Sequence, residues 1–196
     1  MQPVANHVLI DALEQSVESH LQQAVRVFQN MDEDALQRPS PAGGWSIAQC
    51  LWHLNSYGQY YLPRIGAALE QAPENGNGVE HFKSGRLGNY FTRMMEPGKS
   101  KYKVNKRHLP PAVVSPHQTV AEFIQQQETL LHYLRKARAV NLNKIRLPIS
   151  IASLIKLKLG DVLQFVVAHN ERHIQQALRN LAENREGLES PAAAQE

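Results

Sequence analysis

Four long amphipathic segments constrain most strongly what this chain can fold into. In each of them apolar side chains recur every three or four residues, which is the spacing of one face of an α-helix. The segments cover approximately residues 6–30, 46–71, 119–138 and 161–182. Each helix must bury its apolar face against another, because the chain offers no comparable run of strand pattern. The sequence therefore predicts an all-α fold, a four-helix bundle.

The starts of three of these helices carry the pattern of a capping box. In this arrangement the first side chain accepts a hydrogen bond from a free backbone amide, and the fourth residue bonds back to the amide of the first. The patterns are Ser46-x-x-Gln49, Thr119-x-x-Glu122 and a variant that begins with Asp, Asp161-x-x-Gln164. We therefore expect helices to begin beside Ser46, Thr119 and Asp161.

A long connection, residues 72–118, joins the second and third long helices. It contains a segment near residues 87–95 with the pattern of a short helix, followed by the proline-rich stretch 109–111. A connection of this length favours a crossover or a lid over a tight hairpin. No repeat or second linker is visible, so we predict a single domain over residues 1–183 and a disordered tail at 184–196.

Composition narrows the class of protein. No apolar run among the 196 residues reaches the roughly 20 needed for a membrane span, and the N-terminal residues lack the pattern of a signal peptide. Cys50 is the single cysteine, which excludes an internal disulfide and is compatible with a cytoplasmic location. The net charge of +3 is too small to indicate a nucleic-acid partner. We expect a cytoplasmic protein that acts on a small molecule.

Three histidines have informative positions. His169 and His173 are four residues apart in the last helix, so their side chains are neighbours on one helix face. His53 lies within the second helix. If these helices are neighbours, three imidazoles can bind one metal ion and leave a coordination position open. The alternative is that they are half-buried structural histidines, bonded to carbonyl groups or solvent.

Two common metalloprotease patterns are absent. A zincin needs glutamate directly after the first histidine, where this chain has Asn170, and the inverted motif needs glutamate directly before the second, where it has Arg172. The sequence therefore argues against peptidase chemistry of these types. Cys50, one turn before His53, is a possible fourth ligand or a small apolar side chain in the core.

The amino-acid sequence around these histidines resembles that of a known family. The segment WSIAQCLWHL, residues 45–54, is similar to the second-helix motif of the DinB/YfiT-like superfamily. HNERHIQQ, residues 169–176, is similar to the family's H-x-x-x-H motif with a glutamine three residues further on. The order of elements also matches, and the resemblance covers about residues 8–183.

This resemblance implies an up-down-down-up bundle with a divalent metal, commonly zinc or nickel, bound by His53, His169 and His173. Relatives include transferases and isomerases that use low-molecular-weight thiols, as well as metal-dependent hydrolases, and they are often homodimers. By the same resemblance Gln176 is a candidate to orient a ligand or a bound water.

One departure leaves the reaction open. Relatives frequently have an acidic residue shortly after the histidine of the second helix, where this chain has Asn55 and Ser56. The main hypothesis is a metal-dependent thiol S-transferase or hydrolase that activates a thiol or a water. The alternative is a non-catalytic bundle that acts as a binding or stress-response module. The basic stretch 99–108 is either a solvated loop or a rim that attracts an anionic substrate.

Overall fold

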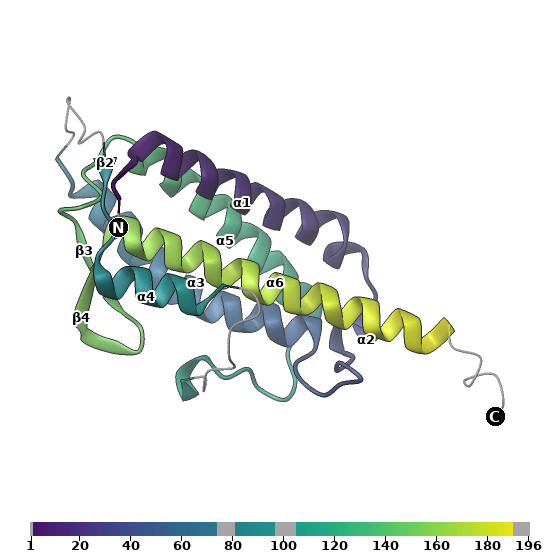
Figure 1. The fold of residues 1–196 in the computed structure, drawn as a ribbon. Helices are drawn as coiled ribbons and strands as arrows, with labels where there is room; N and C mark the ends of the chain where they lie inside the picture. The colour runs from purple at the N-terminus through teal and green to yellow at the C-terminus, as the bar shows by residue number, and fades with distance from the viewer. Residues whose placement is uncertain (1, 74–80, 97–104, 190–196) are drawn as a thin grey trace.

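Four long helices form a bundle in the computed structural model, which describes residues 2–73, 81–96 and 105–189 (Figure 1). The long helices are α1 (Asn6–Arg26), α3 (Ile47–Glu70), α5 (Pro116–Ala137) and α6 (Leu159–Glu189). Helices α1 and α6 run in one direction, and α3 and α5 run in the opposite direction (Figure 1). The predicted all-α bundle and its up-down-down-up order are confirmed.

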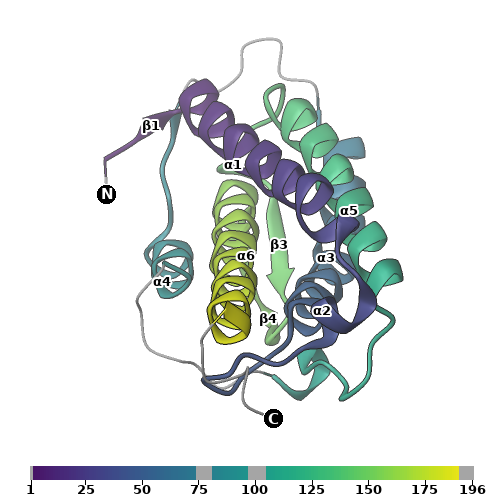
Figure 2. The same ribbon diagram turned by 90° about the vertical axis from the view of Figure 1, so that its right-hand side faces the viewer.

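Each long helix packs against two others. Helices α1 and α3 both contact α5 and α6, so α1 and α3 lie diagonally across the bundle (Figure 2). The chain therefore crosses the bundle between its first and second long helices, instead of turning back as a hairpin. Among the described residues, no helix combines the length and the apolar character that crossing a membrane requires.

The shorter elements include strands that the sequence analysis missed. The short helices are α2 (Glu33–Gln37) and α4 (Arg86–Met94), with 3₁₀ turns η1 (Phe28–Asn30) and η2 (Lys106–His108). Strand β1 (Val4–Ala5) pairs antiparallel with β2 (His81–Phe82), and β3 (Arg146–Ile149) pairs antiparallel with β4 (Ala152–Lys158). Only α4, near 87–95, was expected.

The β3–β4 hairpin forms because its two faces differ. Leu147, Ile149 and Leu157 are buried, whereas Arg146 and Lys156 are exposed. This alternation is the pattern of a strand pair with one face on a core. The hairpin precedes α6 directly and covers one end of the bundle (Figure 1).

One of the three capping predictions is confirmed and two are wrong. The Ser46 hydroxyl accepts from the amide of Gln49 at 3.1 Å, and the Gln49 side chain accepts from the amide of Ser46 at 3.1 Å. Helix α5 instead begins earlier, at Pro116, and the Thr119 hydroxyl donates to the Ser115 carbonyl. A proline at the first position needs no amide partner, so it sets this start.

The third cap fails because another element takes its side chain. Helix α6 begins at Leu159, and Asp161 lies within its first turn. The buried Asp161 carboxylate accepts from the Gly85 amide at 3.1 Å and from the Ser84 hydroxyl. This carboxylate therefore fixes the start of α4 against α6.

The predicted tail begins too early. Helix α6 continues to Glu189, so residues 184–189 are helical, and the Asn184 side chain donates to the Pro39 carbonyl at 3.2 Å. Residues 190–196 lie outside the described residues.

The core has two apolar clusters with a polar layer between them. One cluster joins the hairpin to the neighbouring ends of the long helices, and includes Ile10, Ile65 and Leu163. The other lies toward the opposite end, and includes Phe28 and Phe123. The buried polar side chains in the layer between include His20, His53, Gln127, His169 and Asn170.

Candidate metal centre

The structure brings the three singled-out histidines together. His53 comes from α3, and His169 and His173 come from neighbouring turns of α6. One ring nitrogen from each lies within 4.8 Å of the other two. The Nε2 atoms of His53 and His169 are 3.1 Å apart. The exposed fractions of the three residues are only 2%, 4% and 9%. The expectation that the two helices are neighbours is therefore confirmed.

Hydrogen bonds fix the orientation of two of the rings. His53 donates from Nδ1 to the His108 carbonyl at 2.6 Å, and His173 donates from Nδ1 to the Gln176 side-chain oxygen at 2.9 Å. Because a carbonyl oxygen only accepts, the proton of each neutral ring is on Nδ1. The Nε2 atom of each ring therefore carries a free lone pair. Gln176 therefore fixes the orientation of the His173 ring.

The donor set fits a divalent metal ion. Two imidazole nitrogens on one tetrahedral zinc lie about 3.3 Å apart, as follows from a Zn–N distance of about 2.0–2.1 Å. The 3.1 Å separation of the His53 and His169 nitrogens is close to this value. Among the described residues, the cluster consists of the three histidines and holds no carboxylate. A cation is the partner that this arrangement suits.

Burial keeps the three rings neutral. Desolvation lowers the pKa of His53 to about 4, although its bond to the His108 carbonyl opposes the change. Desolvation and the nearby His53 lower the pKa of His173 to about 3. Desolvation and the nearby His173 hold the pKa of His169 well below its usual value. Neutral imidazole is the form that binds metals.

Aromatic side chains hold the imidazoles in place. The ring of Trp45 lies 4.9 Å from that of His53 and 5.8 Å from that of His173. On the other side, the ring of Tyr57 lies 5.0 Å from that of His53 and 4.3 Å from that of His169. Packing of this kind limits the rotation of the imidazole rings.

His108 is a functional residue that the sequence analysis missed. Its carbonyl orients His53, and its own ring packs 3.9 Å from that of Tyr57. The Ser56 hydroxyl donates to the His53 carbonyl, so it accepts from Nδ1 of His108, 2.9 Å away. Lys106 and Arg107 are exposed, and residues 99–104 of the basic stretch lie outside the described residues. Only His108 of the described stretch 105–108 is buried.

The positions where an acid was expected have other roles. The Asn55 side chain donates to the Thr119 carbonyl at 2.9 Å, which joins α3 to α5. Ser56 holds the ring of His108. A main-chain carbonyl therefore orients His53 in this chain, and no carboxylate is needed for that purpose.

The histidines line a cavity of about 1060 Å³. Its wall includes Trp45, Tyr57 and Phe165. A cavity of this size accommodates a small-molecule substrate beside the three nitrogens. Cys50 is fully buried in the apolar cluster and does not line the cavity, and burial raises the pKa of its thiol to about 12.

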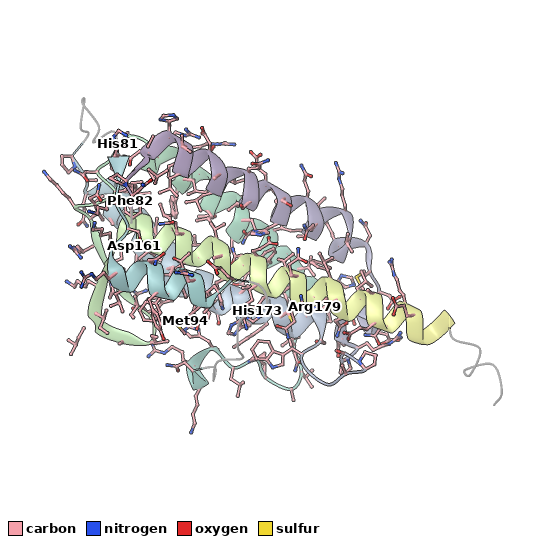
Figure 3. All side chains as sticks on the ribbon, in the orientation of Figure 1. His81, Phe82, Met94, Asp161, His173 and Arg179 are labelled. Carbon is pink, nitrogen blue, oxygen red and sulfur yellow. The ribbon has the colours of Figure 1, made fainter. Side chains whose placement is uncertain are left out.

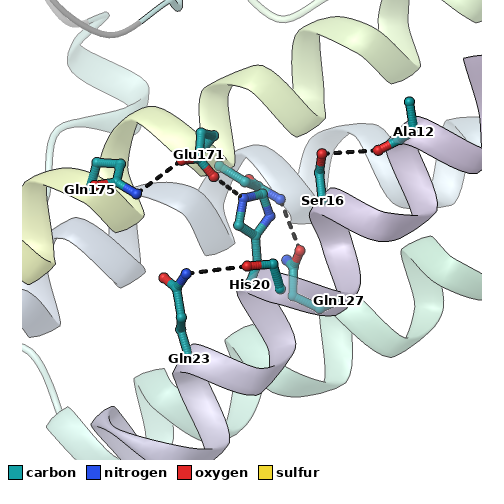
Figure 4. Close-up of polar contacts among 9 residues, drawn as sticks. Ala12, Ser16, His20, Gln23, Gln127, Glu171 and Gln175 are labelled. Carbon is teal, nitrogen blue, oxygen red and sulfur yellow. Dashed lines mark hydrogen bonds and ion pairs between the residues drawn. The ribbon is translucent and has the colours of Figure 1, made fainter.

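Another buried histidine lies on the other side of α6. Nε2 of His20, from α1, bonds to the Glu171 carboxylate at 2.7 Å (Figure 4). This bond lowers the pKa of Glu171. Nearby, the Asn170 side chain donates to the Gln127 side chain at 3.1 Å. This group joins α1, α5 and α6 and has no access to the cavity wall formed by His169 and His173.

Comparison with known proteins agrees with this architecture. The family model described as the DinB superfamily matches residues 16–177. Among solved structures, YfiT from Bacillus subtilis matches with a TM-score of 0.52 and 17% identity, over 93% of this chain and 87% of that one. YfiT is described as a probable metal-dependent hydrolase with an unusual four-helix bundle topology. At this identity the match shows a shared fold. No curated protein matches the chain.

Proposed function

This chain belongs to the DinB superfamily, and we propose that it is a divalent-metal-dependent enzyme. One observation carries the proposal: three buried imidazoles converge at the wall of a large cavity, and two of them are bonded so that their lone pairs are free. His53, His169 and His173 would hold the ion, with zinc or nickel as the expected metal. A substrate would enter from the cavity.

The residues around the site prepare it for this role. The His108 carbonyl and the Gln176 side chain keep two rings in the tautomer that a metal requires. Trp45, Tyr57 and Phe165 pack against the imidazole rings and hold them in position. A divalent ion bound there supplies a Lewis acid, which makes a water or thiol acidic enough to act as a nucleophile near neutral pH.

The surroundings favour a thiol nucleophile over water. Glu183 is the one carboxylate among the described residues that line the cavity, and Ser40 already donates to it at 2.5 Å. Glu183 lies ten residues beyond His173 on α6, which is about 15 Å along the helix axis. A general base beside the histidines is therefore missing from the described cavity wall. A thiol loses its proton more easily than water, so we favour a thiol S-transferase, with hydrolysis as the second candidate.

Metal analysis tests the proposal. Protein stripped with a chelator and reloaded with zinc or nickel is expected to retain about one ion per chain by elemental analysis. His169→Ala is expected to lose the ion and keep its helical circular dichroism. His132→Ala, which removes an exposed histidine of α5, is the matched control and should bind like the wild type. Wild-type protein without a stoichiometric ion would refute the proposal.

A second experiment separates the two reactions. The reloaded protein is mixed with a low-molecular-weight thiol and a fluorogenic electrophile such as monochlorobimane, and in parallel with a nitrophenyl ester. We expect faster thioether formation with the wild type than with His169→Ala. Acceleration of ester hydrolysis alone would favour the hydrolase. A loaded protein that accelerates neither would favour the non-catalytic binding module.

A further inference from the structure

The cavity is apolar at one end. The rings of Tyr61, Phe91 and Phe165, from α3, α4 and α6, meet there, with centroids of neighbouring rings 5.9 and 6.5 Å apart. Ile149 and Leu157 of the β3–β4 hairpin complete this end. It offers contacts to an aromatic or branched apolar group, and the hairpin closes it.

The other end of the cavity presents the guanidinium group of Arg179. Arg179 is exposed at this end, two turns beyond Arg172 on α6 (Figure 3). The structure gives Arg179 no hydrogen bond or ion pair to any residue that it describes, whereas its charge acts on His173 across the cavity wall. A guanidinium in this position is available to an anion.

The other charged side chains of the wall already have partners. Arg172 donates to the carbonyls of Met94 and Glu96 at 3.3 and 3.4 Å, so it holds the end of α4 against α6. Glu183, one turn beyond Arg179, accepts from Ser40. Arg179 is therefore the charged group best placed to bind a substrate.

The histidines lie between the two ends. Along α6 the order is Phe165, His169, His173 and Arg179, and a rise of about 1.5 Å per residue places Phe165 and Arg179 about 21 Å apart along the axis. A molecule that contacts both ends must therefore pass over the nitrogens of the metal centre.

We propose that the substrate is an elongated anion. Its apolar group binds between Tyr61, Phe91 and Phe165, its anionic group binds Arg179, and the bond that reacts lies between them, over the histidines. The position of the reacting bond rests on the proposed enzymatic function. The binding of the two ends does not, because neither end requires the metal.

Binding of three matched probes tests this proposal by isothermal titration calorimetry. The probes are N-(8-phenyloctanoyl)glycine, whose chain is long enough to reach from one end to the other, its neutral glycinamide analogue, and N-acetylglycine, which lacks the apolar group. Each is titrated into metal-free and zinc-loaded protein. The carboxylate probe is expected to bind about tenfold more tightly than the glycinamide, as one charge-assisted contact allows, and this preference should shrink as salt is added. N-Acetylglycine should bind at least tenfold more weakly than the carboxylate probe.

Two variants locate the ends of the ligand. Arg179→Gln is expected to abolish the tenfold preference for the carboxylate and to leave the affinity for the glycinamide unchanged. Phe165→Ala should weaken both phenyl probes equally. Arg185→Gln, which removes an exposed arginine of the same helix outside the cavity, is the matched control and should behave as wild type.

Three results would overturn the proposal: no binding of either phenyl probe at millimolar concentration, equal affinity for the carboxylate and the glycinamide, or an undiminished preference in Arg179→Gln. The metal content of the same samples reports separately on the proposed enzymatic function. Binding that follows the expected pattern without a stoichiometric ion would support the ligand class and refute the metal enzyme.

Discussion

On one side of α6, His169 and His173 direct ring nitrogens toward His53; on the other side, at the same level of the bundle, Glu171 bonds to His20 (Figure 4). Both groups place imidazoles in the polar layer between the two apolar clusters. Where a carboxylate is present, the histidine has a permanent partner and the group joins helices. Where it is missing, the ring nitrogens face one another.

The difference shows that burial of a histidine does not by itself indicate a ligand. His20 is less exposed than His173, with fractions of 0% and 9%. The partner distinguishes them, because His20 bonds to an acid, whereas His53 and His173 bond through Nδ1 to neutral oxygens that leave Nε2 free. The following predictions test this separation.

Metal loading should stabilise the protein only through the group formed by His53, His169 and His173. At free zinc about a thousand times above the dissociation constant, the free energy of unfolding should rise by about 4 kcal/mol. His173→Ala should remove this increase, because one of the three ligands is lost. Glu171→Ala should keep it. Urea unfolding with and without chelator measures the increment, and an equal loss in both variants would contradict the separation.

Removal of the carboxylate that bonds to His20 should destabilise the protein. Glu171→Ala leaves the fully buried His20 ring without a hydrogen bond among the described residues, and is expected to lower the free energy of unfolding by about 1–3 kcal/mol. Glu186→Ala, an exposed acid of the same helix, should change it by less than about 0.5 kcal/mol. Metal stoichiometry should stay at one ion in both. A lower stoichiometry in Glu171→Ala would show that the groups are coupled.

Loss of the Ser56 hydroxyl should act on the metal more than on stability. Ser56→Ala frees the ring of His108, whose carbonyl orients His53, and is expected to weaken zinc binding about tenfold. Ser16→Ala is the control, since Ser16 also bonds back to its own helix but lies beside the second group. Competition with a chromogenic chelator measures affinity. Equal values for the two variants would exclude a positioning role for Ser56.

Cys50 should remain a thiol whether or not metal is bound. Burial raises its pKa from 9.0 to about 12, so the unfolded chain loses this proton first as pH rises. The contribution of Cys50 to stability is therefore constant below pH 9 and is lost between pH 9 and about 12. At pH 8 the native protein should not react with a thiol-specific disulfide reagent. Rapid labelling of Cys50, or labelling that bound metal blocks, would contradict this prediction and make Cys50 a candidate metal ligand again.

Patterns within a few residues predicted the features that depend only on residues close together in the sequence. The Ser46 cap and the His169–His173 pair depend on residues three or four positions apart, so the sequence was sufficient for both. Thr119 and Asp161 carry the same capping pattern, yet α5 begins at Pro116, and the Asp161 carboxylate bonds to the amide of Gly85 instead. A pattern cannot reveal that a partner from another segment has taken its side chain.

The residues that the sequence analysis missed depend on distant segments. His108 reaches the site only because the long connection brings η2 against α3, 55 residues from His53 in the chain. Nothing near His108 distinguishes it from the charged residues around it. His20 did carry a signal, since it continues the apolar spacing of Leu13, Val17 and Ala24 on α1. The sequence of the hairpin also shows alternating apolar and polar residues. The prediction followed only the helical periodicity of α6, which begins directly after the hairpin.

The polar layer between the two apolar clusters also determines how the helices are aligned lengthwise. An entirely apolar interior would tolerate sliding of α6 along α3 by one turn, about 5.4 Å. Leucine and valine side chains can replace one another in such an interior with little loss of stability. Such a shift here would carry His169 away from His53 and Asn170 away from Gln127, and would leave polar atoms buried without partners. The polar layer therefore specifies a single lengthwise register of the helices, even before any ion is bound.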